Sequence, residues 1–202
     1  MKVFIYDNGL NLENYVNAVK ICGNEPILNK DVTLSYDCDA LLLTGGGDVI
    51  SYLYNKPLTT LKNVDAVTDL AETFLINKFV LQKKKIIGVC KGMQILNVYF
   101  GGTLKNVDYH FMSGKDLYHL VSSATSHPLQ KVMGEGMLVN SCHRQAIDKL
   151  GEGLKILYTS SDNTAECITH NTLPILAVQF HPERMAESFV KNFYSYAFKY
   201  EF

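Results

Sequence analysis

Ile86-Ile87-Gly88-Val89-Cys90-Lys91-Gly92-Met93-Gln94 is the most informative stretch of the chain, because it joins a short apolar run to a segment of helical composition. Residues 86–89 predict a buried strand and residues 92–99 predict a helix. Cys90 therefore falls on the turn between them, with a glycine two residues away on each side, which is the pattern of a nucleophile elbow. The free N–H groups and positive dipole end of the helix favour a thiolate at this position. A lone cysteine on a tight turn is more often structural, but the flanking pattern favours a nucleophile.

Apolar runs and amphipathic segments alternate on both sides of this stretch. The predicted strands are 2–6, 40–44 and 175–180, and the predicted helices are 12–22, 63–81 and a closing helix that ends near residue 200. In the helix 63–81 we expect the apolar positions to form the buried face: Val67, Leu70, Ala71, Phe74, Leu75 and Leu81. Between residues 102 and 155 the short runs are more typical of antiparallel strands. The alternation predicts an α/β fold with a mainly parallel sheet.

His181-Pro182-Glu183 follows the last predicted strand and can supply a base and the group that orients it. In an extended segment residues i and i+2 project to the same side, so the carboxylate can hold the imidazole. A histidine after a strand is more often structural, and the three-residue pattern is too short to be specific. Together with the elbow, it predicts a catalytic relay of Cys90, His181 and Glu183.

Composition limits the class of protein. The chain has 202 residues, 47% of them hydrophobic, and a formal net charge of −1. This length predicts one domain, residues 1–202, and the charge gives no general reason to bind nucleic acid or an anionic membrane. Val3–Tyr6 is too short an apolar run for a signal sequence or a membrane span, so we expect a cytoplasmic protein. A homodimer is compatible with these features.

The residues that commonly bind metals show no metal-site spacing. The five cysteines are an odd set without a C-x-x-C pair, which argues against disulfides and structural zinc. His110, His119 and His127 lack HxH or HExxH spacing. The sequence therefore predicts neither a metal site nor a cofactor.

Four blocks in order resemble a known family: residues 41–49, 88–104, 139–147 and 178–183. The G-x-C-x-G-x-Q elbow and the distal H-P-E resemble the class I glutamine amidotransferase superfamily. The four blocks together resemble its γ-glutamyl-γ-aminobutyrate hydrolase family, peptidase C26. The resemblance implies a three-layer, flavodoxin-like sheet with helices on both faces, and cleavage of a γ-glutamyl C–N bond by a cysteine hydrolase.

The resemblance also implies roles for particular residues. The backbone N–H groups of Gly46 and Lys91 would form an oxyanion hole, and such fixed dipoles stabilise a developing oxyanion more than the neutral carbonyl. Gln94 would help to hold the glutamyl group. The block that contains Ser141, Cys142, His143 and Arg144 would bind substrate, although Arg144 departs from the family's usual N-S-x-H-H-Q form.

The chain has two arginines, Arg144 inside the third block and Arg184 directly after the fourth, whereas its other cations are lysines. Because a guanidinium suits carboxylate and phosphate groups, Arg144 is hypothesised to contact an anionic part of the substrate. The alternative is a surface cation.

Three functions compete. The first is a free-standing hydrolase that releases glutamate and an amine through a Cys90 thioester, from a small-molecule substrate such as γ-glutamyl-γ-aminobutyrate or a nucleotide amidate such as γ-glutamyl-CDP-amidate. The second is a glutaminase subunit that delivers ammonia to a synthase, although no obligatory synthase partner is expected. The third is a binding module that retains the fold without catalysis.

Overall fold

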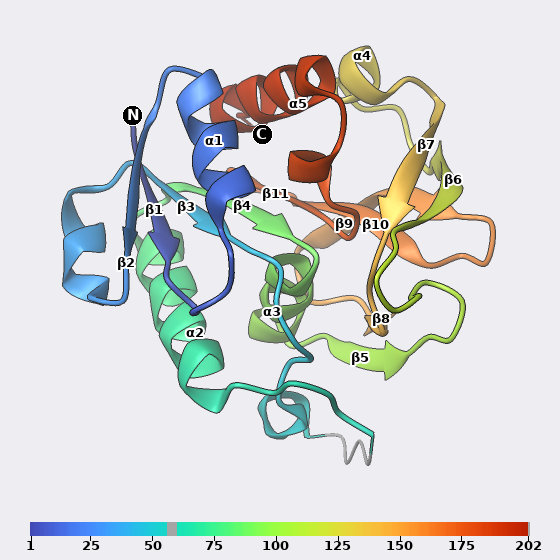
Figure 1. Ribbon diagram of the computed structural model, residues 1–202, viewed down its shortest axis with the longest axis horizontal. Helices are drawn as coiled ribbons and strands as arrows, with labels where there is room; N and C mark the ends of the chain where they lie inside the picture. Colours follow the sequence, from blue (N-terminus) through green and yellow to red (C-terminus); the bar gives the residue numbers. More distant parts are fainter. Residues whose placement is uncertain (56–59, 202) are drawn as a thin grey trace.

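The computed structural model describes residues 1–55 and 60–201 and contains a nine-stranded sheet with the order β2-β1-β3-β4-β11-β10-β9-β6-β7 (Figure 1). Five neighbouring strands run parallel, from β2 to β11 in that order. They are β1 (Lys2–Tyr6), β2 (Glu25–Asn29), β3 (Ala40–Leu43), β4 (Lys85–Val89) and β11 (Ile175–Val178). Strand β4, which carries the predicted elbow at its end, lies in the middle of the sheet between β3 and β11.

The other half of the sheet is antiparallel. Strand β10 (Ala165–His170) pairs with β11, and β9 (Leu154–Ser160), β6 (Leu117–Ser123) and β7 (Gly136–Ser141) follow outward. A separate two-stranded sheet joins β5 (Thr103–Asn106) to β8 (Gln145–Lys149). The predicted α/β class is confirmed, and the expected antiparallel strands mainly extend the central sheet.

Helices cover both faces of the parallel half (Figure 1). Helices α1 (Glu13–Ile21) and α5 (Glu187–Lys199) pack on one face, and α2 (Ala66–Leu81) and α3 (Lys91–Tyr99) on the other, while α4 (Gln130–Met133) is a single turn near α5. Side chains alternate accordingly, since Val3 and Ile5 join the core beneath α1 and α5 while Phe4 joins the opposite core. Within residues 1–55 and 60–201, no helix has both the length and the apolar character needed to cross a membrane.

The buried face predicted for helix α2 is wrong at most of its positions, although Leu75 is buried as predicted. Val67, Leu70 and Leu81 are 72%, 61% and 75% exposed. The helix instead buries a face that includes Asp69 and Glu72 together with an apolar group, Leu75, Ile76 and Phe79. Apolar periodicity failed here because the two buried carboxylates bind a buried lysine, described below, which no local pattern reveals.

Candidate active site

Cys90 occupies a strained turn between β4 and α3. Its backbone has φ 53° and ψ −106°, outside the conformations that a residue with a side chain readily adopts. The turn is held because the Cys90 N–H donates to the Val178 carbonyl at 2.8 Å. A Cβ atom on Gly92 would lie 2.5 Å from the Leu43 carbonyl oxygen, and one on Gly88 would lie 2.9 Å from the Gly92 backbone. The two glycines therefore permit the close packing that the elbow requires.

His181 and Glu183 meet immediately after β11. The Nδ1 atom of His181 lies 2.7 Å from Oε1 of Glu183, and both residues are buried. The pair meets across a 3₁₀ turn, Pro182–Arg184, and not across the extended segment expected from the sequence. Asn140 clamps the histidine backbone: it accepts the His181 N–H at 2.8 Å and donates to the His181 carbonyl at 3.0 Å. The position of the imidazole is thus set by groups before and after it in the chain.

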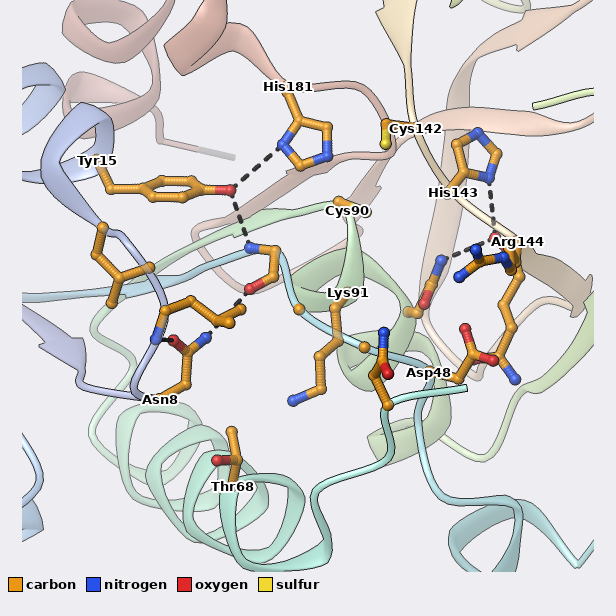
Figure 2. Close-up of a pocket in the computed structure, with 18 of the residues that line it drawn as sticks. Asn8, Tyr15, Asp48, Thr68, Cys90, Lys91, Cys142, His143, Arg144 and His181 are labelled. Carbon is orange, nitrogen blue, oxygen red and sulfur yellow. Dashed lines mark hydrogen bonds between the residues drawn. The ribbon is translucent and has the colours of Figure 1, made fainter. Parts of the chain in front are cut away.

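The remaining ring nitrogen of His181, Nε2, is left for Cys90, which lies below the ring in Figure 2. Burial by itself lowers the pKa of His181, but Cys90 and Glu183 outweigh it and raise the pKa to about 10. An imidazolium is therefore present at neutral pH next to the sulfur. The arrangement suits nucleophilic attack followed by proton donation.

Tyr15 on α1 is a site residue for which the sequence predicts only helical packing. Its hydroxyl accepts the Gly45 N–H at 3.0 Å and lies 3.3 Å from Nδ1 of His181, as the dashed lines in Figure 2 show. It therefore connects the glycine turn after β3 to the histidine. Helical spacing gives a sufficient reason for an aromatic ring at this position, so no sequence signal marked the hydroxyl.

The two predicted oxyanion donors, Gly46 in the glycine turn and Lys91 at the start of α3, both line the cavity that contains Cys90. The neighbouring N–H groups already donate hydrogen bonds within the protein. The Gly45 N–H donates to the Tyr15 hydroxyl, and the Gly92 N–H donates to the Thr44 carbonyl at 3.1 Å. In the described part of the chain, the backbone N–H groups of Gly46 and Lys91 donate no hydrogen bond. A Cβ atom on Gly46 would lie only 2.8 Å from Cδ of Lys91, so the lysine side chain packs closely against the turn.

Lys91 is buried with two carboxylates of α2. Its ammonium contacts Asp69 Oδ1 at 2.8 Å and also pairs with Glu72, and all three side chains are at most 4% exposed. Burial lowers the pKa of Lys91, but Glu72 and Asp69 reverse that effect and raise it. Burial raises the pKa of Glu72 more strongly than Lys91 lowers it. The cluster holds one cation against two acids directly beside the elbow.

A cavity of about 560 Å³ opens over Cys90, which is a volume typical of small-molecule sites. The predicted residues Gln94, Cys142, His143 and Arg144 line it. Ser141 does not belong to the lining, because its hydroxyl is buried and donates to the His110 carbonyl at 3.0 Å. The Gln94 amide nitrogen donates to the Gln145 carbonyl at 2.8 Å, so its oxygen is the atom available to a ligand.

Both arginines line the cavity, but their environments differ. Arg184 is paired, with its guanidinium 3.0 Å from Asp116 and 3.8 Å from Glu183. Arg144 stacks on the ring of Phe111 at 3.6 Å and forms no salt bridge with any residue in the described ranges. The carboxylate of Asp48 lies close enough to interact with its charge but forms no direct salt bridge with it, so the guanidinium stays available to a ligand.

The sheet with helices on both faces, and the thiol at an elbow beside a histidine and a glutamate, define a glutamine amidotransferase-like hydrolase. A comparison with family models agrees, because the model described as peptidase C26 matches residues 12–183. The chain belongs to the peptidase C26 family.

Relatives support the same assignment. A glutamine amidotransferase-like protein of Lactococcus lactis is 38% identical over 159 residues, which cover 72% of this chain and 66% of that protein. The γ-glutamyl-CDP-amidate hydrolase of Campylobacter jejuni is 29% identical over 174 residues, 78% of this chain and 76% of the relative. The crystal structure of a glutamine amidotransferase from Thermotoga maritima has a TM-score of 0.69 at 14% identity and covers 97% of this chain and 82% of that one. At this identity the structural likeness shows the fold alone.

Proposed function

We propose that this chain is a free-standing hydrolase of γ-glutamyl amides in which Cys90 forms a γ-glutamyl thioester. The observation that carries the proposal is the position of Cys90 on a strained elbow beside the His181–Glu183 pair, at the floor of the cavity. The γ-glutamyl half of the substrate is supported by the family and by the named activity of the Campylobacter relative.

The reaction begins when the Cys90 sulfur attacks the γ-carbonyl carbon. The carbonyl oxygen becomes an oxyanion that the N–H groups of Gly46 and Lys91 stabilise, and losing one such donor commonly costs about 3 kcal/mol. As the C–N bond breaks, His181 donates its Nε2 proton to the departing amine. The products of this half-reaction are the free amine and a γ-glutamyl thioester.

Water completes the cycle. Now neutral, His181 accepts a proton from the attacking water, and the second oxyanion collapses to glutamate and the Cys90 thiolate. Glu183 holds the Nδ1–H throughout, so that Nε2 is always the nitrogen that exchanges protons. No step requires a partner chain or a cofactor.

The amine half of the substrate is proposed to carry an anionic group. Arg144 supports this proposal, because its guanidinium lines the cavity and forms no direct salt bridge among the described residues, although the Asp48 carboxylate interacts with its charge from nearby. γ-Glutamyl-γ-aminobutyrate carries a carboxylate there, and a nucleotide amidate such as γ-glutamyl-CDP-amidate carries phosphates. Both classes of anion fit a planar guanidinium.

A release assay tests the function. Purified protein is incubated with glutamine, γ-glutamyl-γ-aminobutyrate, a neutral γ-glutamyl alkylamide and a γ-glutamyl nucleotide amidate, and glutamate is measured. We expect turnover of the anionic amides with kcat/KM at least about tenfold above that for glutamine, the effect of one added charge-assisted contact. Turnover of glutamine alone would contradict the proposal and would favour the glutaminase subunit. Complete inactivity of folded protein on the whole panel would favour the binding module.

Replacing Arg144 with glutamine tests the anionic half. For the anionic amide we expect KM to rise by about 10- to 100-fold, the loss of one charge-assisted contact of roughly 1.5–3 kcal/mol, with a much smaller effect on kcat. For the neutral alkylamide KM should change little. An equal change for both substrates would mean that Arg144 supports the cavity wall and does not bind the anion.

A further inference from the structure

Three imidazoles and one carboxylate converge in the antiparallel half of the molecule, in a cluster that the proposed reaction does not use. Oε1 of Glu166 on β10 lies 3.2 Å from Nε2 of His119 on β6. The same oxygen lies 3.8 Å from Nδ1 of His110, in the loop before β6, and 3.8 Å from Nε2 of His143, between β7 and β8. The side chain of Glu166 is fully buried, and those of His110 and His143 are at most 5% exposed.

In two of these rings, the nitrogen that faces away from Glu166 already donates a hydrogen bond. Nδ1 of His143 lies 2.9 Å from the Gln145 carbonyl, which can only accept, so this nitrogen carries the proton. Nε2 of His110 lies 2.8 Å from the carboxylate of Asp162 and donates to it in the same way. A neutral imidazole has one N–H group. The nitrogens of His110 and His143 that face Glu166 therefore present lone pairs to a carboxylate that is also an acceptor. The Nε2 atom of His119, 3.2 Å from Glu166 Oε1, is the nitrogen that can donate to it.

The inward-facing atoms lack hydrogen bonds. Among residues 1–55 and 60–201, Nε2 of His119, Nε2 of His143 and both carboxylate oxygens of Glu166 are buried without a hydrogen-bond partner. The Ser141 hydroxyl lies 3.3 Å from Nδ1 of His110, but it is closer to the His110 carbonyl, 3.0 Å away, which accepts its proton. His119 can supply one proton to Glu166, but the inward nitrogens of His110 and His143 still converge on the carboxylate as acceptors, which is costly unless a cation lies between them.

We propose that His110 Nδ1, His119 Nε2, His143 Nε2 and Glu166 Oε1 bind one divalent transition-metal ion of the zinc class. Three imidazoles and one carboxylate are a donor set that suits this ion, and ligands about 2.0–2.1 Å from a tetrahedral zinc lie roughly 3.3–3.4 Å apart. The separations from Glu166 are 3.2–3.8 Å, and the ligand atoms of His110, His143 and Glu166 all lie within 4.8 Å of one another, whereas His119 is close to Glu166 but lies outside that mutually close group. His110, His143 and Glu166 would move inward by roughly 1 Å, and His119 would move with them to become the fourth ligand.

The groups behind the ligands match those of known metal sites. A metal-binding histidine almost always donates its other N–H group to a carboxylate or a backbone carbonyl, which fixes the tautomer. The Asp162 carboxylate accepts from Nε2 of His110, and the Gln145 carbonyl accepts from Nδ1 of His143. The same Gln145 carbonyl accepts from Gln94 in the cavity, so the ion would hold the wall of the active site without touching the substrate.

Sequence spacing could not reveal this site. His110, His119 and His127 are the histidines that lie near one another in the sequence, but the structure places His127 elsewhere, with its Nε2 atom 3.3 Å from the hydroxyl of Tyr200. The missing ligands, His143 and Glu166, come from separate strands and connections, and they join the cluster only because β6, β9 and β10 are neighbours in the sheet.

The test is a titration of untagged, chelator-treated protein with ZnCl₂ and, separately, with CoCl₂. We expect one saturable Zn²⁺ site by calorimetry and the intense visible absorption of four-coordinate Co²⁺. At a zinc concentration about 100 times the Kd, the midpoint of thermal unfolding should rise by about 5–10 °C. The absence of saturable binding of both ions would overturn the proposal and would leave Glu166 paired with a protonated imidazole.

Three variants locate the site. His119→Gln should weaken zinc binding at least about 100-fold, and Asp162→Asn should weaken it about 10- to 100-fold through the orientation of His110. His127→Gln is the matched control, a histidine outside the cluster, and should leave the Kd unchanged. Circular dichroism verifies that each variant is folded. Unchanged zinc affinity in a folded His119→Gln variant would also overturn the proposal.

The Co²⁺ spectrum of the wild-type protein keeps the test decisive if a ligand variant fails to fold. Imidazole and carboxylate donors give d–d bands without the thiolate charge-transfer band of a cysteine site. A strong charge-transfer band would assign the bound metal to a cysteine, such as Cys90 or Cys142, and would overturn the proposed ligand set.

Discussion

Cys90→Ala is expected to lower kcat for γ-glutamyl amide hydrolysis by about 10⁴- to 10⁶-fold, the range observed when the nucleophile of a triad enzyme is removed. The reason is that the acyl intermediate forms on this sulfur. Stability should change little, because alanine occupies the same strained φ of 53° and the change removes only a small buried group. Glutamate release by the wild-type and variant proteins, each verified by thermal unfolding, measures the effect.

The thiol control is Cys22→Ala, which removes a half-buried cysteine outside the cavity and should leave kcat essentially unchanged. Intact mass spectrometry of wild-type protein quenched during turnover should show an adduct with the mass of one γ-glutamyl group, which Cys90→Ala should lack. Retention of more than about a tenth of the activity in Cys90→Ala would exclude the thioester mechanism and would leave the fold assignment intact.

Lys91→Met is expected to destabilise the protein by about 3–5 kcal/mol, because it leaves Asp69 and Glu72 buried without their cation. For a chain of this size the loss corresponds to a fall of roughly 6–20 °C in the midpoint of thermal unfolding. Methionine keeps most of the aliphatic stem that packs against Gly46, so the charge is the main change. Differential scanning calorimetry and urea denaturation measure the effect.

If the lost charge is the cause, two further results are expected. Neutralising the acids in Asp69→Asn/Glu72→Gln/Lys91→Met should recover about half or more of the lost stability, since no buried charge then remains unpaired. The deficit of Lys91→Met should also shrink as the pH falls from about 8 to about 5. Burial already raises the pKa of Glu72, and without Lys91 it rises further, so the native state takes up a proton that stabilises it below that pKa. A deficit that is independent of pH and is not rescued would assign Lys91 to packing alone.

Much of the parallel half could be predicted because its signals are local. The apolar runs of β1, β3, β4 and β11 are continuous in sequence, since parallel strands covered on both faces are buried throughout. Strand β2 was not predicted, because its side chains are only partly buried or exposed and lack an apolar pattern. The antiparallel half could be expected only in outline, since half-buried strands and turns give weaker patterns.

Some residues of the candidate site could be predicted from local sequence, and others could not. Cys90 could be predicted because an elbow needs small residues at fixed distances along the chain, and those glycines are visible in the sequence. The role of Tyr15 could not be predicted, because its hydroxyl contacts Gly45 and His181, which are 30 and 166 residues away in the sequence. The predicted buried face of helix α2 was wrong at most of its positions for the same reason, since Lys91 lies on another helix.

The order of amino acids was enough to predict the strand-to-helix elbow, the histidine–glutamate pair that follows the last strand, and the family to which the chain belongs. These features depend on neighbours within a few residues, where backbone geometry dictates which side chains are allowed. Which polar groups are buried together emerged only from packing: Lys91 with Asp69 and Glu72, and the three imidazoles with Glu166. Burial and charge pairing are properties of the packed sheet and helices, because removing a charge from water is tolerated only where a partner from elsewhere in the chain meets it.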